Sequence, residues 1–221
     1  LGDNQLSGDF LSRVVSFLPN LRYLYVPFNN ITGHVPLSLT NSTQLQVLDL
    51  SSNAFTGKIP SQFCSSSSAS LEKLLLSNNY LAGTVPSELG NCKKLRTIDL
   101  SFNNLVGSIP SEIWTLPDLS DMVMWANNLT GEIPEDICIH GGNLQTLILN
   151  DNVINGTIPQ SIANCTNLIW VTLSNNRLTG EIPSGIGNLI NLAILQLGNN
   201  SLTGAIPPEI GKCRSLIWLD V

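Results

Sequence analysis

Residues 168–183 read LIWVTLSNNRLTGEIP, and this stretch carries the pattern that decides the fold. The pattern L-x-x-L-x-L-x-x-N-x-L-x-G-x-I-P, with small apolar exchanges, occurs eight times along the chain. The eight units begin at Leu21, Leu45, Leu71, Leu95, Leu119, Leu144, Leu168 and Leu192. Six units have 24 residues, the unit at Leu45 has 26 and the unit at Leu119 has 25. A repeat of this length indicates a solenoid, in which each unit buries its leucines only against its neighbours.

The positions within one unit predict how the chain turns. Positions 4 to 6 alternate between apolar and exposed residues, as in Leu48-Asp49-Leu50, which is typical of a short strand with one buried face. Position 9 is always Asn, whose amide can donate and accept hydrogen bonds to the backbone inside each turn. Gly at position 13 and Pro at position 16 shape the return leg. We therefore expect a parallel concave β-sheet and an irregular or 3-10 convex side.

The repeats account for the whole chain. We expect one solenoid over residues 1–221, with eight complete repeats over 21–215 and partial repeats over 1–20 and 216–221. Both ends fall within a repeat and neither offers a cap, so we expect an internal segment of a longer protein. No apolar run is long enough to span a bilayer, so we expect no direct membrane insertion by this segment.

Composition and side-chain pattern argue against catalysis. The formal charge is −6, which disfavours binding to nucleic acid. His34 and His140 lie in different units without a nucleophile beside them, and Asp49 and Asp99 lie two units apart on an open sheet. The glycines recur at the solenoid period and form no phosphate loop. We expect no enzyme activity, no metal and no cofactor.

The cysteines occupy matching repeat positions. Cys64 and Cys138 lie at position 20 of the two longer units, and Cys92 and Cys165 lie at position 22 of the units that follow. Stacking brings these positions within reach of a disulfide, so we predict the pairs Cys64–Cys92 and Cys138–Cys165. Cys213 is left over and is expected to be a small buried residue. The alternative is that all five are buried free thiols.

Six Asn-x-Ser/Thr sequons indicate glycosylation. They begin at Asn30, Asn41, Asn128, Asn155, Asn164 and Asn199, and Asn164 adjoins a predicted disulfide that could restrict its access. Sequons and disulfides together favour an oxidising, secretory setting.

The concave face carries an apolar strip near the end of the chain. Positions 2, 3, 5, 7 and 8 of each unit are expected to point out of the sheet, and large apolar residues gather there in the last units. They are Trp170, Ile194 and Trp218 at position 3, with Ile169, Ala193 and Ile217 at position 2. Such a patch favours a ligand site for a small apolar molecule or a protein segment. The alternative is a seat for the sequence that follows Val221.

Other aromatic residues give weaker signals. Tyr23, Tyr25 and Phe28 form a second concave cluster near the other end, and Trp125 stands alone at position 7. Trp114 is expected to pack on the convex side.

The return leg, as in residues 129–134 (LTGEIP), resembles the plant-specific leucine-rich-repeat class over the whole chain. Four longer stretches narrow the resemblance to the brassinosteroid receptor kinases, and in particular to the receptor-like paralogues of the principal receptor. These stretches are residues 124–130, 174–183, 192–195 and 214–220.

The resemblance implies a function. In that family an island domain follows the segment similar to residues 215–220, and the steroid lies between the island and the concave face. Residues matching Ile194, Ile217 and Trp218 line that groove, and Trp170 belongs to the same strip. A somatic-embryogenesis-type co-receptor kinase completes the complex outside the plasma membrane, and a single-pass receptor carries a cytoplasmic Ser/Thr kinase domain. This chain ends before any island, so we expect it to bind the hormone weakly or not at all by itself.

Three alternatives remain. A receptor for peptides or pathogen patterns would use a long polar groove, which Ser51, Ser77 and Ser101 at position 7 do little to provide. A secreted inhibitor of cell-wall hydrolases shares the repeat but has caps. The units before Leu144 could serve only as a spacer.

Overall fold

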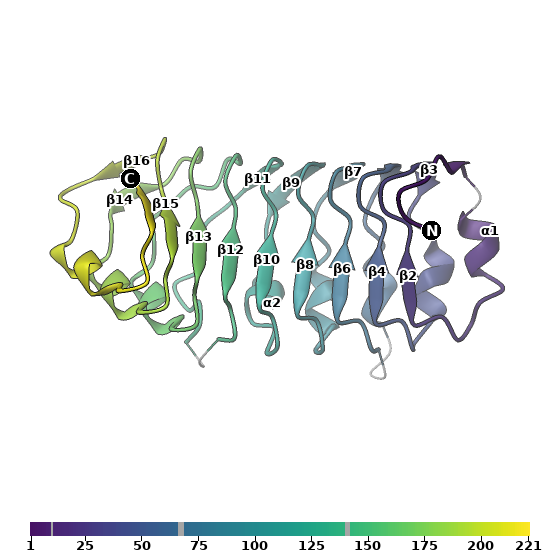
Figure 1. Cartoon of the computed structure of the whole chain (residues 1–221), viewed down its shortest axis with the longest axis horizontal. Helices are drawn as coiled ribbons and strands as arrows, with labels where there is room; N and C mark the ends of the chain where they lie inside the picture. The colour runs from purple at the N-terminus through teal and green to yellow at the C-terminus, as the bar shows by residue number, and fades with distance from the viewer. Residues whose placement is uncertain (10, 66–68, 140–141) are drawn as a thin grey trace.

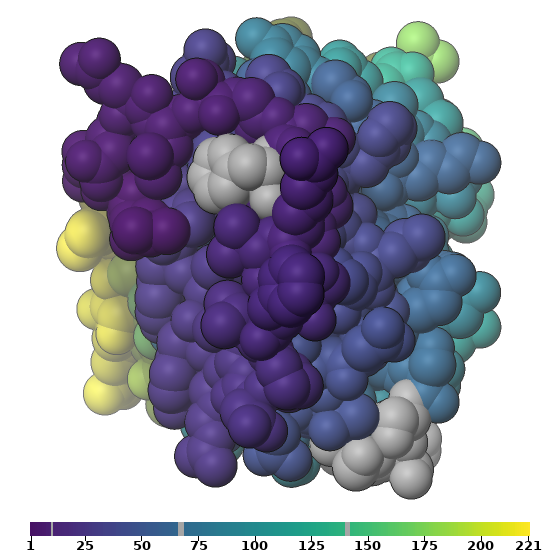
Figure 2. All heavy atoms as spheres, turned by 90° about the vertical axis from the view of Figure 1, so that its right-hand side faces the viewer, coloured from purple at the N-terminus to yellow at the C-terminus, as the bar shows by residue number. Residues whose placement is uncertain are grey.

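The computed structural model describes residues 1–9, 11–65, 69–139 and 142–221. The chain forms an elongated solenoid whose two termini lie at opposite ends (Figure 1). Figure 2 looks onto the N-terminal end, where the first partial unit (purple) lies over the unit that begins at Leu21. Most complete units contribute one strand, a short second strand and a helical turn, as Figure 1 shows for the successive colours. Among the described residues, the unit at Leu119 has no helix and the unit at Leu144 has isolated bridges in place of a second strand.

One face is a nine-stranded, fully parallel sheet, which confirms the predicted concave sheet. Its strands, in chain order, are β2 (Tyr23–Tyr25), β4 (Val47–Asp49), β6 (Lys73–Leu75), β8 (Thr97–Asp99), β10 (Asp121–Val123), β12 (Thr146–Ile148), β13 (Trp170–Thr172), β15 (Ile194–Gln196) and β17 (Trp218–Asp220). Neighbouring units pair without a register shift, so residues at the same repeat position lie side by side, as Trp170 does with Ile194. The central residue of each strand from β2 to β15 is buried.

A second parallel ladder, which the repeat pattern did not predict, runs beside the first sheet. Its strands are β1 (Ser7–Gly8), β3 (Asn30–His34), β5 (Ala54–Gly57), β7 (Tyr80–Gly83), β9 (Asn104–Ser108) and β11 (Asn128–Thr130), with β14 (Thr179–Glu181) and β16 (Ser201–Thr203) as a separate pair. Isolated bridges join Glu132 to Asn155 and Thr157 to Thr179 between the two parts. The convex side is therefore less irregular than expected, because the return leg pairs before it reaches the helical turn.

Glycine at position 13 allows this second ladder to close. Gly131 has φ +84°, a left-handed conformation that disfavours residues with a Cβ. A Cβ at Gly131 would also stand 2.8 Å from Cβ of Ser108 in the preceding unit. Both the dihedral angle and the close approach between units thus require glycine.

Short helical turns line the convex side, as predicted. The 3-10 helices are η1 (Leu37–Asn41), η2 (Ser61–Cys64), η3 (Ser87–Asn91), η4 (Gln160–Asn164), η5 (Ser184–Asn188) and η6 (Pro208–Lys212), and the α-helical turns are α1 (Leu11–Val15) and α2 (Ser111–Trp114). The position-16 proline precedes each 3-10 turn, as Pro86 does at η3 with φ −68°. Its ring fixes φ, and with ψ 131° Pro86 is an extended N-cap residue from which the chain enters the turn. Within the described residues, no helix is long and apolar enough to cross a membrane.

The interior is one continuous apolar core with an asparagine ladder at its edge. Leu48, Leu50 and Phe55 are fully buried, and the equivalent residues of all units join the same cluster. Asn79 shows the ladder's geometry: its Oδ1 accepts from the Phe55 backbone N–H at 3.0 Å, and its Nδ2 donates to the Leu50 carbonyl at 3.0 Å. Each position-9 amide thus connects backbone groups of neighbouring turns, as the sequence predicts.

The two predicted disulfides are present. Cys64 pairs with Cys92 at a Cα–Cα distance of 5.1 Å, and Cys138 pairs with Cys165 at 5.3 Å. Each bond joins one of the two longer units to the next unit. The alternative of five free thiols is therefore wrong, because only Cys213 is free among the described residues, and it is buried as expected.

Candidate functional site: the concave face

The apolar strip forms one exposed surface at the C-terminal end of the nine-stranded sheet. We call Ile169, Trp170, Ala193, Ile194, Ile217 and Trp218 the C-terminal strip. Trp170 pairs with Ile194, and Ile194 pairs with Trp218, so three apolar side chains lie in one row across β13, β15 and β17. Trp170 is 41% exposed, Trp218 56% and Ile217 84%, whereas Ala193 and Ile194 are half-buried. The structure thus brings together all four predicted ligand-contact residues, Trp170, Ile194, Ile217 and Trp218.

A polar notch lies beside the C-terminal strip on the same strands. It has a volume of about 410 Å³ and is lined by Asn150, Thr172, Ser174, Asn175, Gln196, Gly198, Asn199 and Asp220. Thr172, Gln196 and Asp220 stand two residues after Trp170, Ile194 and Trp218, so the notch and the strip share one face. The notch was not among the sites predicted from the sequence. The feature of the sequence that indicates it is Gly198, because every other complete unit has a side chain at position 7.

The remaining concave positions are less uniformly exposed than expected. Val47, Thr172 and Ser101 are buried although they occupy positions 3, 5 and 7. Val47 lies between Tyr23 and Lys73 in the sheet, whose longer side chains flank it on both sides. Lateral packing within a row therefore covers small residues that the strand pattern alone would place in solvent.

The other aromatic residues form two separate groups. Tyr23, Tyr25 and Phe28 are all exposed at the N-terminal end, and the Tyr23 hydroxyl donates a 2.6 Å hydrogen bond to Oε1 of Gln46. The prediction that Trp125 stands alone is wrong, because its ring packs edge-to-face on Phe102 with centroids 4.2 Å apart.

Trp114 lies on the convex side as predicted. Its ring is half-buried against the core, beside a cavity of about 240 Å³ that Leu116 and Leu144 also line. The ring therefore packs between units and does not reach the concave face.

The acidic residues on the sheet are engaged in local structure. The Asp49 carboxylate accepts from the Ser51 hydroxyl at 2.6 Å, and Asp99 accepts from Ser101 at 2.7 Å. These bonds fix two Asp-Ser pairs on strands β4 and β8, which are separated by β6. Across the described residues no group of three His, Cys, Asp or Glu could hold a metal ion. Of the two histidines, His34 is exposed on β3, and His140 lies outside the described residues.

The six sequon asparagines all avoid the strands of the nine-stranded sheet. Three of them lie on the flank formed by the second ladder, namely Asn30, Asn128 and Asn155. Asn41 and Asn164 lie on helical turns, and Asn199 lies at the rim of the notch. All six are exposed, so Asn164 is accessible despite its neighbouring disulfide. Glycans at the first five positions would leave the concave face open.

Family models for leucine-rich repeats match most of the chain. The model described as "Leucine rich repeat" matches residues 19–81, "Leucine Rich repeats (2 copies)" matches 69–121, and "Leucine Rich Repeat" matches 143–165, 167–189 and 191–213. Among curated proteins, the chain is 56% identical over 71 residues to a brassinosteroid LRR receptor kinase, BRL3, of Oryza sativa subsp. japonica. That match covers 31% of this chain and 6% of the relative.

Solved structures give the same family at lower identity. A TDR receptor superimposes with TM-score 0.93 at 30% identity, covering 100% of this chain and 38% of that one. The Arabidopsis receptor kinase HAESA, solved with the peptide hormone IDA and the co-receptor SERK1, superimposes with TM-score 0.81 at 34% identity. This match covers 100% of this chain and 40% of that one. The chain therefore spans well under half of the receptors it resembles.

Proposed function

Because the chain belongs to the leucine-rich-repeat family and has the non-catalytic fold of plant receptor-kinase ectodomains, we propose that its concave face recognises a ligand at the C-terminal strip. The observation that carries this proposal is the row Trp170, Ile194 and Trp218, in which two exposed indole rings lie on either side of the half-buried Ile194. Contiguous apolar surface of this kind usually marks an interaction site.

The ligand class that we propose is a brassinosteroid-type steroid. Two indole rings and the Ile194 side chain offer a broad, rigid apolar wall, which suits a fused-ring ligand that has few rotatable bonds. The curated relative that shares 56% identity over 71 residues is named as a brassinosteroid receptor kinase, which favours this ligand class. An open wall encloses only one side of such a ligand, so we propose that an island domain and a co-receptor kinase of the SERK type cover its other sides.

The proposed location is the extracellular side of the plasma membrane. The two disulfides favour an oxidising compartment. The six exposed sequons agree with passage through the secretory pathway, and none of them lies on a strand of the ligand-facing sheet.

Photoaffinity labelling tests the steroid proposal. The chain is irradiated with a photoreactive brassinolide derivative, with and without excess brassinolide, and the labelled peptides are mapped by mass spectrometry. We expect competed labels on residues 169–170, 193–194 and 217–218. Trp170→Ala should reduce this labelling several-fold, whereas Tyr23→Ala, at the same repeat position in β2, should leave it unchanged. Labels that brassinolide does not displace, or labels of equal yield in both variants, would contradict the proposal.

A peptide ligand is the second candidate. Solved neighbours of the fold include receptors described as bound to peptide hormones, HAESA with IDA among them. The specific observation in its favour is the polar notch beside the C-terminal strip, because a peptide presents both apolar side chains and hydrogen-bonding groups. In the labelling experiment, the absence of competed steroid labels would favour this candidate over the first.

A further inference from the structure

Phe28 is an exposed aromatic residue in an unfavourable backbone conformation. Its side chain is 59% exposed, and its φ of +51° lies in the left-handed region, which costs a bulky residue free energy. Its backbone N–H donates to the Ser51 carbonyl at 3.1 Å, and its carbonyl accepts from the Asn4 N–H at 3.2 Å. The position-8 residues of the two adjacent units, Asp3 and Ser52, are also present. Phe28 thus has its neighbours within the solenoid on both sides and is still exposed.

A second phenylalanine in the same conformation shows what such a ring can contact. Phe102 also occupies position 8, with φ +50°, and its ring packs on Trp125 with centroids 4.2 Å apart. Among the described residues, Phe28 makes no ring contact of this kind. The other complete units have small or polar residues at position 8, namely Ser52, Asn78, Ala126, Asp151, Asn175 and Asn199. Of the two phenylalanines, Phe28 is the one whose ring remains available to a further contact.

A glycosylation sequon begins two residues after Phe28. Asn30 and Thr32, its first and third residues, are exposed. The residues between these exposed positions point into the solenoid: the Asn29 carboxamide accepts from the backbone there, and Ile31 is fully buried. Phe28, Asn30 and Thr32 therefore face outward on the same side of the chain.

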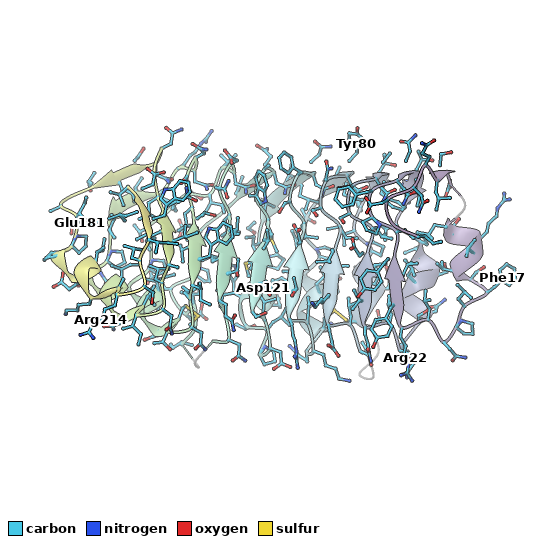
Figure 3. All side chains as sticks on the ribbon, viewed as in Figure 1. Phe17, Arg22, Tyr80, Asp121, Glu181 and Arg214 are labelled. Carbon is cyan, nitrogen blue, oxygen red and sulfur yellow. A yellow bond between two sulfur atoms is a disulfide. The ribbon has the colours of Figure 1, made fainter. Side chains whose placement is uncertain are left out.

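The surface around Asn30 can accommodate a sugar. Position-10 side chains stand on the upper edge of the solenoid and point away from it, as Tyr80 does (Figure 3). The ladder partner of Asn30 is Ser7, and that of Thr32 is Ala54, and both have small side chains. In the described part of the chain no hydrogen bond engages the Asn30 carboxamide, so its Nδ2 is free for modification. Glycosylation replaces one Nδ2 proton by a bond to C1 of N-acetylglucosamine, and a lipid diphosphate leaves the donor oligosaccharide.

An aromatic ring at this place fits the first sugar of the glycan. Residues i and i+2 of an extended chain lie about 6.5 Å apart, a distance that a pyranose ring linked to the second side chain spans. The C–H groups on one face of N-acetylglucosamine carry partial positive charge, and the face of an aromatic ring is negative. We propose that the Phe28 ring packs against the first N-acetylglucosamine of a glycan on Asn30 and orders that glycan. The proposal rests on the secretory location proposed above.

Asn128 supplies a matched comparison within the same chain. It occupies position 10 as Asn30 does, and its sequon also ends in threonine. The residue two positions before it is Ala126, with φ +54°, which has no ring to offer. Trp125 lies one residue further back, but its ring is half-buried and packs on Phe102. We therefore expect no aromatic packing on the sugar of Asn128.

NMR of singly glycosylated chains tests the proposal. One chain keeps only the Asn30 sequon and a second keeps only the Asn128 sequon, with glutamine at the other sequon asparagines. Both are secreted from a eukaryotic host, and the glycan is trimmed enzymatically to one ¹³C-labelled N-acetylglucosamine. A proton above an aromatic ring is shielded, so we expect upfield signals from the carbon-bound protons of the sugar on Asn30. The sugar on Asn128 should give signals at ordinary positions.

Two variants locate the effect in the Phe28 ring. Phe28→Ala should return the signals of the Asn30 sugar to ordinary positions, and its far-ultraviolet circular dichroism should stay unchanged because the side chain is exposed. Phe102→Ala, at the same repeat position and in the same conformation, should leave the upfield signals in place.

Three results would overturn the inference. They are ordinary signals for the Asn30 sugar in the parent chain, upfield signals that persist in Phe28→Ala, and a secreted chain in which Asn30 carries no glycan. The proposed location is judged separately, by peptide mapping of the chain with all six sequons. Absence of glycan from all six would contradict the secretory location as well, whereas a glycan on Asn30 without upfield signals would contradict only the role of Phe28.

Discussion

Replacing Asn79 by alanine tests how the solenoid holds its turns together. Asn79 is 6% exposed, and its carboxamide connects its own unit, which begins at Leu71, with the preceding unit, which begins at Leu45. Its Oδ1 accepts from the Phe55 N–H at 3.0 Å, and its Nδ2 donates to the carbonyls of Leu50 and Leu76 at 3.0 and 3.1 Å. Asn79→Ala removes these three bonds, and a fourth from Nδ2 to the Ser77 carbonyl at 3.1 Å, at a place that solvent scarcely reaches.

The expected loss of unfolding free energy depends on which hydrogen-bond partners each backbone group retains in the variant. The buried Phe55 N–H loses its acceptor, which costs about 1–3 kcal/mol. The two carbonyls each keep a second donor, Asn53 for Leu50 and Asn103 for Leu76, so each loses a bond worth about 0.5–1.5 kcal/mol. We therefore expect the free energy of unfolding to fall by about 3–4 kcal/mol.

Equilibrium urea unfolding, followed by far-ultraviolet circular dichroism, measures the loss. Asn29→Ala is the matched control, because this half-buried asparagine makes the same contacts at the end of the solenoid, where one of its partners is the exposed Leu1 carbonyl. Water can replace those bonds, so we expect a loss of about 1 kcal/mol. Equal losses at the two sites, or a loss below about 1 kcal/mol at Asn79, would refute this account of the ladder.

Three further outcomes follow from the structure. Replacing both Cys64 and Cys92 by serine opens a loop of sequence separation 28 and should lower the free energy of unfolding by about 3–4 kcal/mol, measured by urea unfolding. Burial raises the pKa of the Cys213 thiol, so iodoacetamide at pH 8 should alkylate it slowly in the folded chain and rapidly in denaturant, as followed by intact mass. Gly131→Ala should destabilise the chain by about 1–3 kcal/mol in a thermal melt, and wild-type stability would contradict the reading of its φ of +84°.

The concave sheet was predictable from the sequence because the same short strand pattern, weak evidence in a single copy, recurs in every repeat. Three residues such as Leu48-Asp49-Leu50 could form many structures, but eight copies at one spacing leave parallel stacking as the arrangement that buries every leucine. The disulfides were predictable for the same reason, because equivalent positions of adjacent units must be close, as Cys64 and Cys92 are.

The second ladder was not predictable from local pattern. Its strands, such as β9 (Asn104–Ser108), contain glycine and polar residues that have low strand propensity. They pair because the stacked units bring return legs together, with glycine removing the side chain between them. Tertiary geometry there overrides the preference of the individual residues.

The C-terminal strip was predictable from the sequence, whereas the notch was not. Large apolar side chains such as Trp170 and Trp218 indicate an exposed apolar surface, since their repeat position fixes the direction in which they point. The notch depends on the side chain that Gly198 lacks and on hydrogen-bond partners such as Asn175 and Asn199. A missing side chain becomes informative only when its neighbours are known in three dimensions.

The central claim is that the concave face of β13, β15 and β17 is where this chain meets its ligand. The most direct measurement is an amide chemical-shift map of the ¹⁵N-labelled chain titrated with brassinolide. The account predicts weak, fast-exchange shifts that cluster on residues 169–172, 193–196 and 217–220. Shifts that cluster on β2 and β4 or on the convex helical turns would contradict it.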